Sequence, residues 1–317
     1  SMAEHLDSVC EYPDRDYKEL RDSLSYYLGI PAANIIPGNG ATELIGLTFQ
    51  VLCPKNALLL APTYSEYTRE ISLAGGSYKE YFLKEENDFH LDLEDLKNHL
   101  TKDVDLFAFC NPNNPTSGAL DTGEIREILE HCRRQGIFVM IDETYVEFAP
   151  DIQKISAVPL VPDYDNLMIL RGTSKFFAVP GLRLGYGLCS NSRFLEELSR
   201  IKNPWTINTL AAVSGGVMFQ DESYIQRTRS LISEERKRCL DILSQCPQYK
   251  TYPAFANFLL VRLMDGTTSF EMFEKCIRKN LMIRDCSSFE GLQGEYIRFC
   301  IQTKEANDRL LKILTEQ

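Results

Sequence analysis

The 317-residue sequence predicts an α/β fold: a mostly parallel central sheet with helices on both faces, plus a smaller α+β domain at the C-terminus. Two observations support this. Up to about residue 189, short apolar runs typical of buried strands alternate regularly with helical patterns. Later in the chain, strands and helices follow one another without that alternation. We therefore expect an N-terminal segment (1–34), a large domain (35–235) and a small domain (236–317).

The individual elements follow from the same patterns. A helix is expected up to Leu28, and an apolar helical pattern follows the Gly38–Thr42 turn as far as Leu52. The alternation then predicts strands over 57–60, 78–83, 106–110, 138–141, 167–170 and 184–189, and helices over 65–74, 93–100 and 123–135. Helical patterns dominate 194–243. In the small domain we expect strands over 258–262, 282–283 and 296–301 and helices over 269–279 and 304–314.

The composition is ordinary for a globular protein, with 44% hydrophobic and 25% charged residues. A net charge of −11 and the lack of a basic run disfavour nucleic-acid binding. No apolar run is long enough to span a membrane and no signal peptide is recognised, so a cytoplasmic protein is expected. The ten cysteines form no CxxC pair, and the four histidines lie in polar segments. We therefore expect reduced thiols, no metal site and no serine triad.

Polar motifs stand where predicted strands of the sheet end. They are Thr63-Tyr64, Asn113-Asn114, Asp142 and Ser174-Lys175. Because ligands of such sheets bind beyond the carboxyl ends of the strands, these loops are expected to converge on one site.

The segment Ile169–Gly187, ILRGTSKFFAVPGLRLGYG, carries the main chemical hypothesis. If Lys175 is buried just past its strand, its pKa falls and its amine becomes a nucleophile and base. The hydroxyls of Thr173 and Ser174, together with Arg183, would hold a phosphate. This combination suggests a Schiff-base lysine for pyridoxal 5′-phosphate (PLP). The alternative is an ordinary loop lysine.

Other residues allow a functional and a structural interpretation. Gly38–Thr42 opens a helix whose N-terminus would bind phosphate, or is a plain turn. Tyr64 would stack on a planar ring, or packs internally. Asn114 would donate to a ring oxygen, or belongs to a turn. Asp142 would pair a protonated pyridine nitrogen, with Tyr145 reaching the ring oxygen, or it caps a helix.

Two arginines of the small domain lie in apolar contexts. Arg284 occurs in LMIRDC and Arg298 in YIRFC, so both read as residues of buried strands. Each guanidinium would bind a carboxylate or phosphate through paired hydrogen bonds. The alternative is a salt bridge, for instance between Arg284 and Asp285.

The motifs PGNGATELI, APTYSEY, NPNNPTS, IDETYVEF and TSKFFAVPGLRLGYG, in this order, resemble the fold-type I PLP-dependent enzymes of the class I/II aminotransferase superfamily. The resemblance runs from Tyr12 to about Thr303. Within the superfamily the chain is similar to threonine-phosphate decarboxylases and histidinol-phosphate aminotransferases. The segments KFFAVPGLRLGY, NPWTIN (203–208) and IRDCSSFEGL (283–292) resemble the decarboxylases of cobalamin biosynthesis more closely.

The resemblance implies a role for each site residue. Lys175 would carry PLP as a Schiff base, Asp142 would pair the pyridine nitrogen and Tyr64 would stack on the ring. The other cofactor contacts implied are Gly40, Ala41, Thr42, Asn114, Tyr145, Thr173, Ser174, Arg183 and, from the second subunit of a homodimer, Tyr12. The substrate contacts implied are Arg298 for a carboxylate and Arg284, with Asn208, for a distal phosphate. The N-terminal segment would pack with the small domain and the partner subunit.

The chain departs from the family pattern in three places. Ser117 replaces the glycine of the usual NPTG, which we expect to matter little. Gly172 stands where a second hydroxyl is usual. Eleven residues precede Tyr12, where family members usually have some tens.

The favoured function is decarboxylation of an O-phospho-amino acid, L-threonine phosphate or L-serine phosphate, after the substrate amine displaces Lys175 from the cofactor. The alternative is an aminotransferase for histidinol phosphate or a related phosphorylated amine, working with glutamate and 2-oxoglutarate. A third possibility, a regulator or inactive binding protein of the same fold, is disfavoured because Lys175 and Asp142 are both present.

Overall fold

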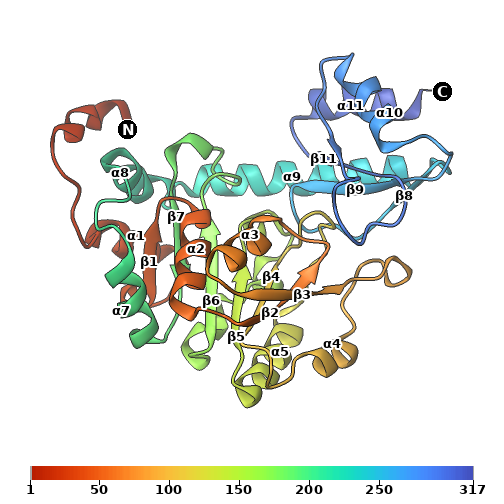
Figure 1. Ribbon diagram of the computed structural model, residues 1–317. Helices are drawn as coiled ribbons and strands as arrows, with labels where there is room; N and C mark the ends of the chain where they lie inside the picture. Colours follow the sequence, from red (N-terminus) through yellow and green to blue (C-terminus); the bar gives the residue numbers. More distant parts are fainter. Residues whose placement is uncertain (1, 317) are drawn as a thin grey trace.

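The computed structural model describes residues 2–316, and its larger part is built on a seven-stranded mixed sheet, the large sheet (Figure 1). The strand order is β1-β7-β6-β5-β4-β2-β3, and β7 is antiparallel to both of its neighbours while the other pairs are parallel. The strands are β1 (Ile35–Gly38), β2 (Asn56–Ala61), β3 (Ser77–Phe82), β4 (Leu106–Cys110), β5 (Phe138–Asp142), β6 (Leu167–Gly172) and β7 (Gly185–Leu188). This confirms the predicted α/β class with a mostly parallel sheet.

Helices cover both faces of the large sheet, which explains why its central strands are continuously apolar. In β4, Phe107 and Phe109 pack into one buried cluster while Leu106 and Ala108 pack into another, so successive side chains serve opposite faces. One face is covered by α2 (Ala41–Leu52), α3 (Glu66–Leu73) and α7 (Ser192–Ile201). The other carries α1 (Lys18–Leu28), α4 (Leu93–His99), α5 (Thr122–Gln135), α8 (Thr209–Met218) and α9 (Glu222–Leu243).

The reversed direction of β7 matters for the site. Because β7 runs antiparallel to its neighbours, it begins where β6 ends, and Arg183, two residues before β7, lies at the carboxyl edge of the large sheet. β7 also approaches the start of α2 closely: a Cβ at Gly185 would lie 2.4 Å from the amide nitrogen of Ala41. Only glycine allows that approach.

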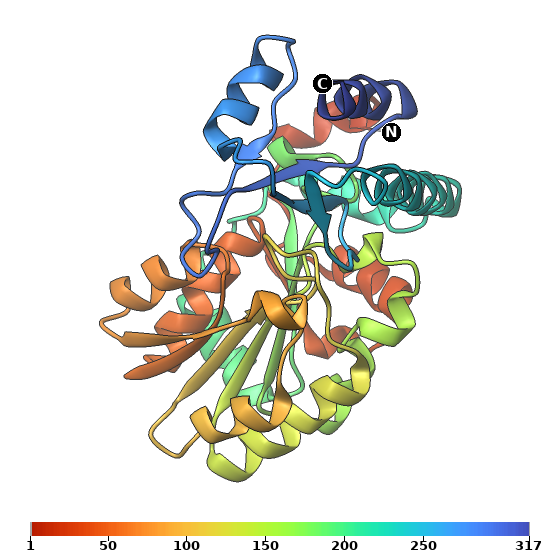
Figure 2. The same ribbon diagram turned by 90° about the vertical axis from the view of Figure 1, so that its right-hand side faces the viewer.

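The C-terminal part is built on a second, four-stranded antiparallel sheet, the small sheet, in the order β10-β11-β9-β8. Its strands are β8 (Tyr249–Thr251), β9 (Phe258–Leu263), β10 (Arg284–Asp285) and β11 (Tyr296–Cys300), with helices α10 (Ser269–Ile277) and α11 (Lys304–Thr315). Helix α9 leads from the large sheet to the small one, which lies above the carboxyl edge in Figure 2. The expected domain boundary at 235/236 falls inside this continuous helix.

Some local expectations need correction. The short strand expected at 282–283 lies at Arg284–Asp285, because those two residues pair with β11 while Met282 is 79% exposed. Strands β1 and β8 were not expected, since each is very short. Ser117 adopts the left-handed conformation (φ 63°), and its Oγ accepts a hydrogen bond from the amide of Ala256 at 3.0 Å. The serine thus ties the turn after β4 to the start of β9.

Within residues 2–316, no helix is long and apolar enough to cross a membrane. The same residues contain no cluster of histidine, cysteine or acidic side chains arranged to hold a metal ion. All ten cysteines carry free thiols, and most of them are buried.

Candidate active site

Asp142 ends β5 and lies at the centre of the carboxyl edge, with 5% of its surface exposed. Its Oδ1 accepts hydrogen bonds from the amide and the hydroxyl of Thr144, at 2.9 and 2.5 Å. Its Oδ2 accepts one from the hydroxyl of Tyr67 at 2.8 Å. Burial raises the pKa of Asp142, and the hydrogen bonds from Thr144 and Tyr67 and the charge of Lys175 oppose that rise. The site therefore contains a buried carboxylate held mainly by neutral donors.

Tyr67 is a site residue that the sequence analysis missed. It lies in α3, one helical turn after Tyr64, and is fully buried. The two rings pack edge to face, with centroids 5.7 Å apart and an interplanar angle of 86°. Tyr64 itself is partly exposed and lines a cavity next to Thr63. The motif YSEY could have indicated this contact. Its two tyrosines are three residues apart at the beginning of a helix, a spacing that places side chains on the same side.

Lys175 differs from the expectation in its burial. The residue lies in a turn beyond the end of β6 and is exposed, because the chain leaves the sheet three residues earlier, at Gly172. Its ammonium nevertheless lies close enough to Asp142 to affect the pKa of that carboxyl. The structure thus brings the lysine and the aspartate together, but without the burial that the sequence suggested.

A phosphate-sized cradle forms where α2 begins. Gly40 (φ 80°) precedes α2 without a side-chain cap, so the first amides of this 12-residue helix are free to bind an anion. A Cβ at Gly40 would lie 2.4 Å from Nη2 of Arg183, so the guanidinium rests directly on the glycine. A Cβ at Gly172 would lie 3.8 Å from both the Cβ of Ala41 and the Oγ of Ser174. Helix amides, a hydroxyl and a guanidinium therefore surround one point.

Thr42 belongs to the same surroundings, since it is the second residue of α2 and lies close enough to Tyr64 to oppose the rise that burial causes in the pKa of that phenol. Thr173 is fully buried, and its hydroxyl donates to the carbonyl oxygen of Leu184 at 3.0 Å, which ties β6 to β7. A contact of Thr173 with the cofactor phosphate stays a prediction.

Asn208 and Tyr12, two other residues of the predicted site, make contacts of their own. Asn208 caps α8: its Oδ1 accepts from the amide of Ala211 at 2.9 Å, and its Nδ2 donates to the carbonyl oxygen of Leu182 at 3.1 Å. Tyr12 is 83% exposed and its ring packs against Trp205 at 5.3 Å between centroids. A contact of Tyr12 with a second subunit stays a prediction.

Asn114 and Tyr145 connect the large sheet to the small one. Asn114 is 8% exposed, and its Oδ1 accepts a hydrogen bond from Nη1 of Arg298. The guanidinium of Arg298 lies over the ring of Phe258, 4.9 Å from its centroid. Tyr145 packs edge-on against the same ring at 5.0 Å, and burial raises its pKa above the usual value. Asn114, Tyr145 and Arg298 thus form one contact group.

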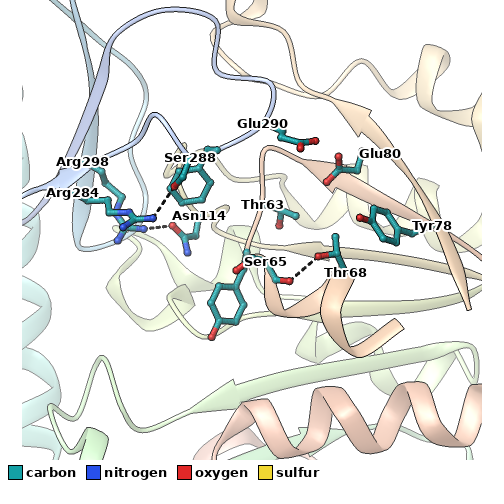
Figure 3. Close-up of a pocket in the computed structure, with 12 residues that line it drawn as sticks. Thr63, Ser65, Thr68, Tyr78, Glu80, Asn114, Arg284, Ser288, Glu290 and Arg298 are labelled. Carbon is teal, nitrogen blue, oxygen red and sulfur yellow. Dashed lines mark hydrogen bonds between the residues drawn. The ribbon is translucent and has the colours of Figure 1, made fainter. Parts of the chain in front are cut away.

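A cavity of about 490 Å³ opens between the two sheets beside this group (Figure 3). Arg284 and Arg298 pair directly across β10 and β11, so their side chains leave the same face of the small sheet. Both line the cavity with Asn114 and Tyr64. Arg284 is exposed, contrary to the expected buried strand, and donates to Oγ of Ser288 at 2.9 Å. The part of the chain that the structure describes shows no salt bridge between Arg284 and its neighbour Asp285.

The far end of this cavity is acidic, which the sequence did not reveal. Glu80 of β3 and Glu290 of the loop before β11 face each other there. Burial and the neighbouring Glu290 carboxyl raise the pKa of Glu80. The cavity therefore has a cationic end beside Asn114 and an anionic end beside Tyr78.

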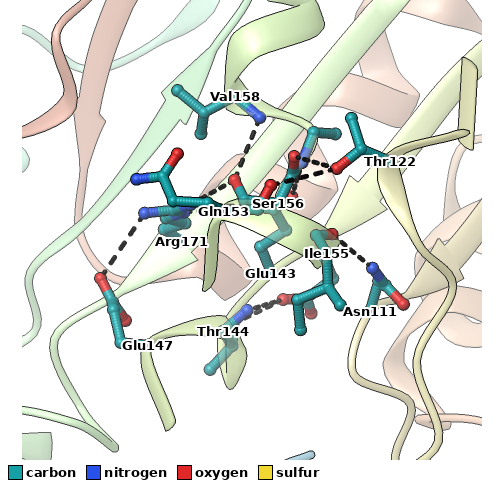
Figure 4. A network of polar contacts seen from close by, with 12 residues as sticks. Asn111, Thr122, Glu143, Thr144, Glu147, Gln153, Ile155, Ser156, Val158 and Arg171 are labelled. Carbon is teal, nitrogen blue, oxygen red and sulfur yellow. Dashed lines mark hydrogen bonds and ion pairs between the residues drawn. The ribbon is translucent and has the colours of Figure 1, made fainter. Parts of the chain in front are cut away.

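Glu143, the residue after Asp142, belongs to a buried ionic network with Arg171 (Figure 4). Glu143 is fully buried and accepts hydrogen bonds from Nε and Nη2 of Arg171 at 3.0 and 2.7 Å and from the amide of Ala157 at 2.5 Å. Arg171 also contacts Ser156 at 2.8 Å and Glu147 at 3.8 Å. This network supports the strand ends on which the site is built.

The fold and this arrangement define a class of protein, and the comparisons agree. Residues 3–314 match the family model for aminotransferase class I and II, so the chain belongs to that family. Its relatives include a putative threonine-phosphate decarboxylase of Caldanaerobacter subterraneus subsp. tengcongensis, 35% identical over 96% of this chain and 83% of the relative. The threonine-phosphate decarboxylase of Salmonella typhimurium is 32% identical over 99% of this chain and 85% of its own.

Aminotransferases are equally close. A histidinol-phosphate aminotransferase of Methanococcus maripaludis is 32% identical over 99% of this chain and 84% of the relative. The crystal structure of the histidinol-phosphate aminotransferase from Clostridium acetobutylicum superposes with a TM-score of 0.92 at 30% identity, covering 99% of this chain and 93% of that one. The comparisons thus establish a PLP-dependent enzyme, either a decarboxylase or an aminotransferase.

The residues present fit PLP, the cofactor of this family. The cradle of Gly40, Ala41, Ser174 and Arg183 offers the donors that a phosphate needs. Asp142 is a buried carboxylate without a cationic hydrogen-bond partner among the described residues, which suits a protonated pyridine nitrogen.

Proposed function

We propose that this protein decarboxylates an O-phospho-amino acid, L-threonine phosphate or L-serine phosphate, with PLP as cofactor. The observation that carries the proposal is the direct pairing of Arg284 and Arg298 across two neighbouring strands, beside Asn114. Guanidinium groups so close together repel each other unless anions lie between or upon them. A short substrate with a carboxylate and a phosphate supplies two anions at that spacing.

The contacts of the two arginines support a different role for each. Arg298 is held by Asn114 over the ring of Phe258, so it is the more fixed of the two and would bind the carboxylate. Arg284 is exposed and bonded to Ser288, so it would bind the distal phosphate at the cavity wall. The acidic pair Glu80 and Glu290 repels anions, which favours binding at the arginine end.

The remaining roles concern the cofactor. PLP, when bound, supplies an electron sink for the bond that lies perpendicular to its ring. Lys175 would hold the cofactor covalently and afterwards deliver a proton to the α-carbon of the substrate. Asp142 would keep the pyridine nitrogen protonated, while Tyr64 covers the ring, and Asn114 and Tyr145 bind its phenolic oxygen. Gly40, Ala41, Thr42, Ser174 and Arg183 would bind the cofactor phosphate.

The alternative is an aminotransferase acting on histidinol phosphate or a related phosphorylated amine. It is supported by the similarity to histidinol-phosphate aminotransferases, one of which superposes at a TM-score of 0.92. In that case the arginine pair would bind the phosphate of one substrate and the carboxylates of glutamate in turn.

One experiment separates the two. PLP-loaded protein is incubated with O-phospho-L-threonine, O-phospho-L-serine or histidinol phosphate, and carbon dioxide and amino-group transfer to 2-oxoglutarate are measured in parallel. Carbon dioxide release without dependence on 2-oxoglutarate supports the decarboxylase. Transfer to 2-oxoglutarate without carbon dioxide refutes it in favour of the aminotransferase.

We also propose a homodimer in which the exposed Tyr12 contacts the cofactor phosphate of the partner subunit. Size-exclusion chromatography tests this, and an active PLP-loaded monomer contradicts it.

A further inference from the structure

Tyr67 contacts two site residues at once. Its hydroxyl donates to Oδ2 of Asp142 at 2.8 Å, and its ring packs edge to face on Tyr64, with centroids 5.7 Å apart. The side chain is fully buried in α3, below the surface on which a ligand would lie. Tyr67 therefore does not line the cavity, yet it touches the residue expected to pair the pyridine nitrogen and the residue expected to cover the ring.

The two oxygens of Asp142 are not equivalent. Oδ1 accepts two hydrogen bonds, both from Thr144, so its lone pairs are filled. Among the described residues, the one hydrogen bond to Oδ2 comes from Tyr67, which leaves one lone pair of that oxygen free. An incoming N–H group would bind there. The Tyr67 hydroxyl thus fixes the direction in which the free lone pair points.

Tyr67 is a permanent donor in this position. Burial and the carboxylate of Asp142 raise the pKa of Tyr67 well above its ordinary value, so the phenol stays protonated. The other titratable groups facing Asp142 come from β4, from the turns after β5 and β6, and from the loop before α3. They are Cys110, Tyr145, Lys175 and Tyr64. Within residues 2–316, none of these four groups donates a hydrogen bond to Oδ2.

We propose that Tyr67 is a positioning residue of the cofactor site: it holds Asp142 ionised with Oδ2 aimed at the pyridine nitrogen, and it supports the ring of Tyr64. The inference rests on PLP binding, which family membership establishes, and is independent of whether the reaction is decarboxylation or transamination.

The test compares Tyr67→Phe with the intact chain in two measurements that need no substrate. The first is the dissociation constant of PLP, which we expect to rise about 10-fold, because one hydrogen bond to a charged group is lost. The second is the pH titration of the visible absorption of the bound cofactor, whose midpoint should shift by roughly one pH unit. Unchanged values for both measurements overturn the proposal.

Tyr164→Phe is the matched control. Tyr164 is also buried and donates a hydrogen bond to a carboxylate, Oε1 of Glu130, at 2.7 Å, but that pair lies away from the site. The control should leave the affinity for PLP and the titration unchanged. An equal effect of both variants would show a general loss of stability and would contradict the proposal.

A second variant keeps the test decisive if Tyr67→Phe does not fold. Incorporation of 3-fluorotyrosine at position 67 preserves the shape and makes the hydroxyl a stronger donor to Asp142. The pH midpoint of the absorption titration should then shift in the direction opposite to the shift in Tyr67→Phe. If only the fluorotyrosine variant folds, its midpoint should differ from that of the intact chain. An unmoved midpoint refutes the role of the hydroxyl. In Asp142→Asn, adding Tyr67→Phe should change PLP affinity no further, and a full additional loss would overturn the coupling.

Discussion

Asp142 and Glu143 are neighbours at the end of β5, but their side chains have different surroundings. Asp142 faces the side of the large sheet that α3 covers, where its hydrogen-bond donors are Thr144 and Tyr67. Glu143 faces the opposite side, where Arg171 neutralises it. Burial alone therefore does not prepare a carboxylate to bind a ligand. The carboxylate without a cationic hydrogen-bond partner among the described residues is the one left able to bind the cation of a ligand.

The largest effect is expected on the Glu143 side. Arg171→Met should lower the free energy of unfolding by about 3–5 kcal/mol, because it leaves a fully buried carboxylate without its charge partner. Chemical denaturation measures this. Activity per folded molecule should stay near that of the intact chain, and a selective loss of turnover with unchanged stability would break the comparison.

The Asp142 side should respond in the opposite way. Asp142→Asn should lower kcat by about 10²–10³, since a charge placed for the transition state is removed. The unfolding free energy of the cofactor-free variant should not fall. Steady-state kinetics on the active substrate, with denaturation of the cofactor-free protein as control, check both statements. Full activity in Asp142→Asn would remove Asp142 from the proposed site.

The pH dependence of the cofactor-free protein sharpens the contrast. Because burial raises the pKa of Asp142 above its ordinary value of 3.8, the native state binds more protons than the unfolded state above that pH. Stability should therefore fall as the pH rises through this interval and level off above the native pKa. Asp142→Asn should lack this part of the fall. Glu147, whose pKa burial also raises, acts with the same sign in both proteins, so their difference isolates Asp142.

A third carboxylate, Glu85, should give the smallest of the expected effects. Burial acts to raise its pKa, but hydrogen bonds from Arg262, Tyr252 and Lys250 outweigh this and lower it to about 2. Its stabilisation is present above the ordinary value of 4.5 and is lost as the pH falls toward 2. Glu85→Gln should cost about 1 kcal/mol at neutral pH, because the cluster is partly solvated. Thermal unfolding at pH 7 and pH 3 measures it, and an equal cost at both would disprove the assignment.

Much of the site follows from the sequence because its residues stand at strand ends. Strands of a parallel sheet carry their carboxyl ends to one edge, so Asn114, Asp142 and Lys175 converge whatever the details of packing. The same reasoning gave most strands and helices to within a few residues.

The features that the sequence did not reveal depend on how deeply a side chain is buried and on the direction of the chain after a strand. Tyr67 lies below the site, and no pattern distinguishes its ring from an ordinary core residue. Asn208 stands before a helix, a position that an N-cap explains without a ligand. The exposure of Lys175 and the inward hydroxyl of Thr173 follow from where the chain turns after β6, which apolar patterning does not specify. The antiparallel course of β7 was likewise invisible.

The antiparallel direction of β7 limits which insertions the site tolerates. Lys175 and Arg183 belong to a single short excursion between two hydrogen-bonded neighbours, β6 and β7, whose register is fixed from Ile169 paired with Leu188 to Gly172 paired with Gly185. Lys175 lies three residues after the end of β6, and Arg183 lies two residues before the start of β7. The positions of the two residues are therefore linked through the paired strands. An insertion between them would therefore displace together the lysine proposed to hold the cofactor covalently and the arginine proposed to bind its phosphate.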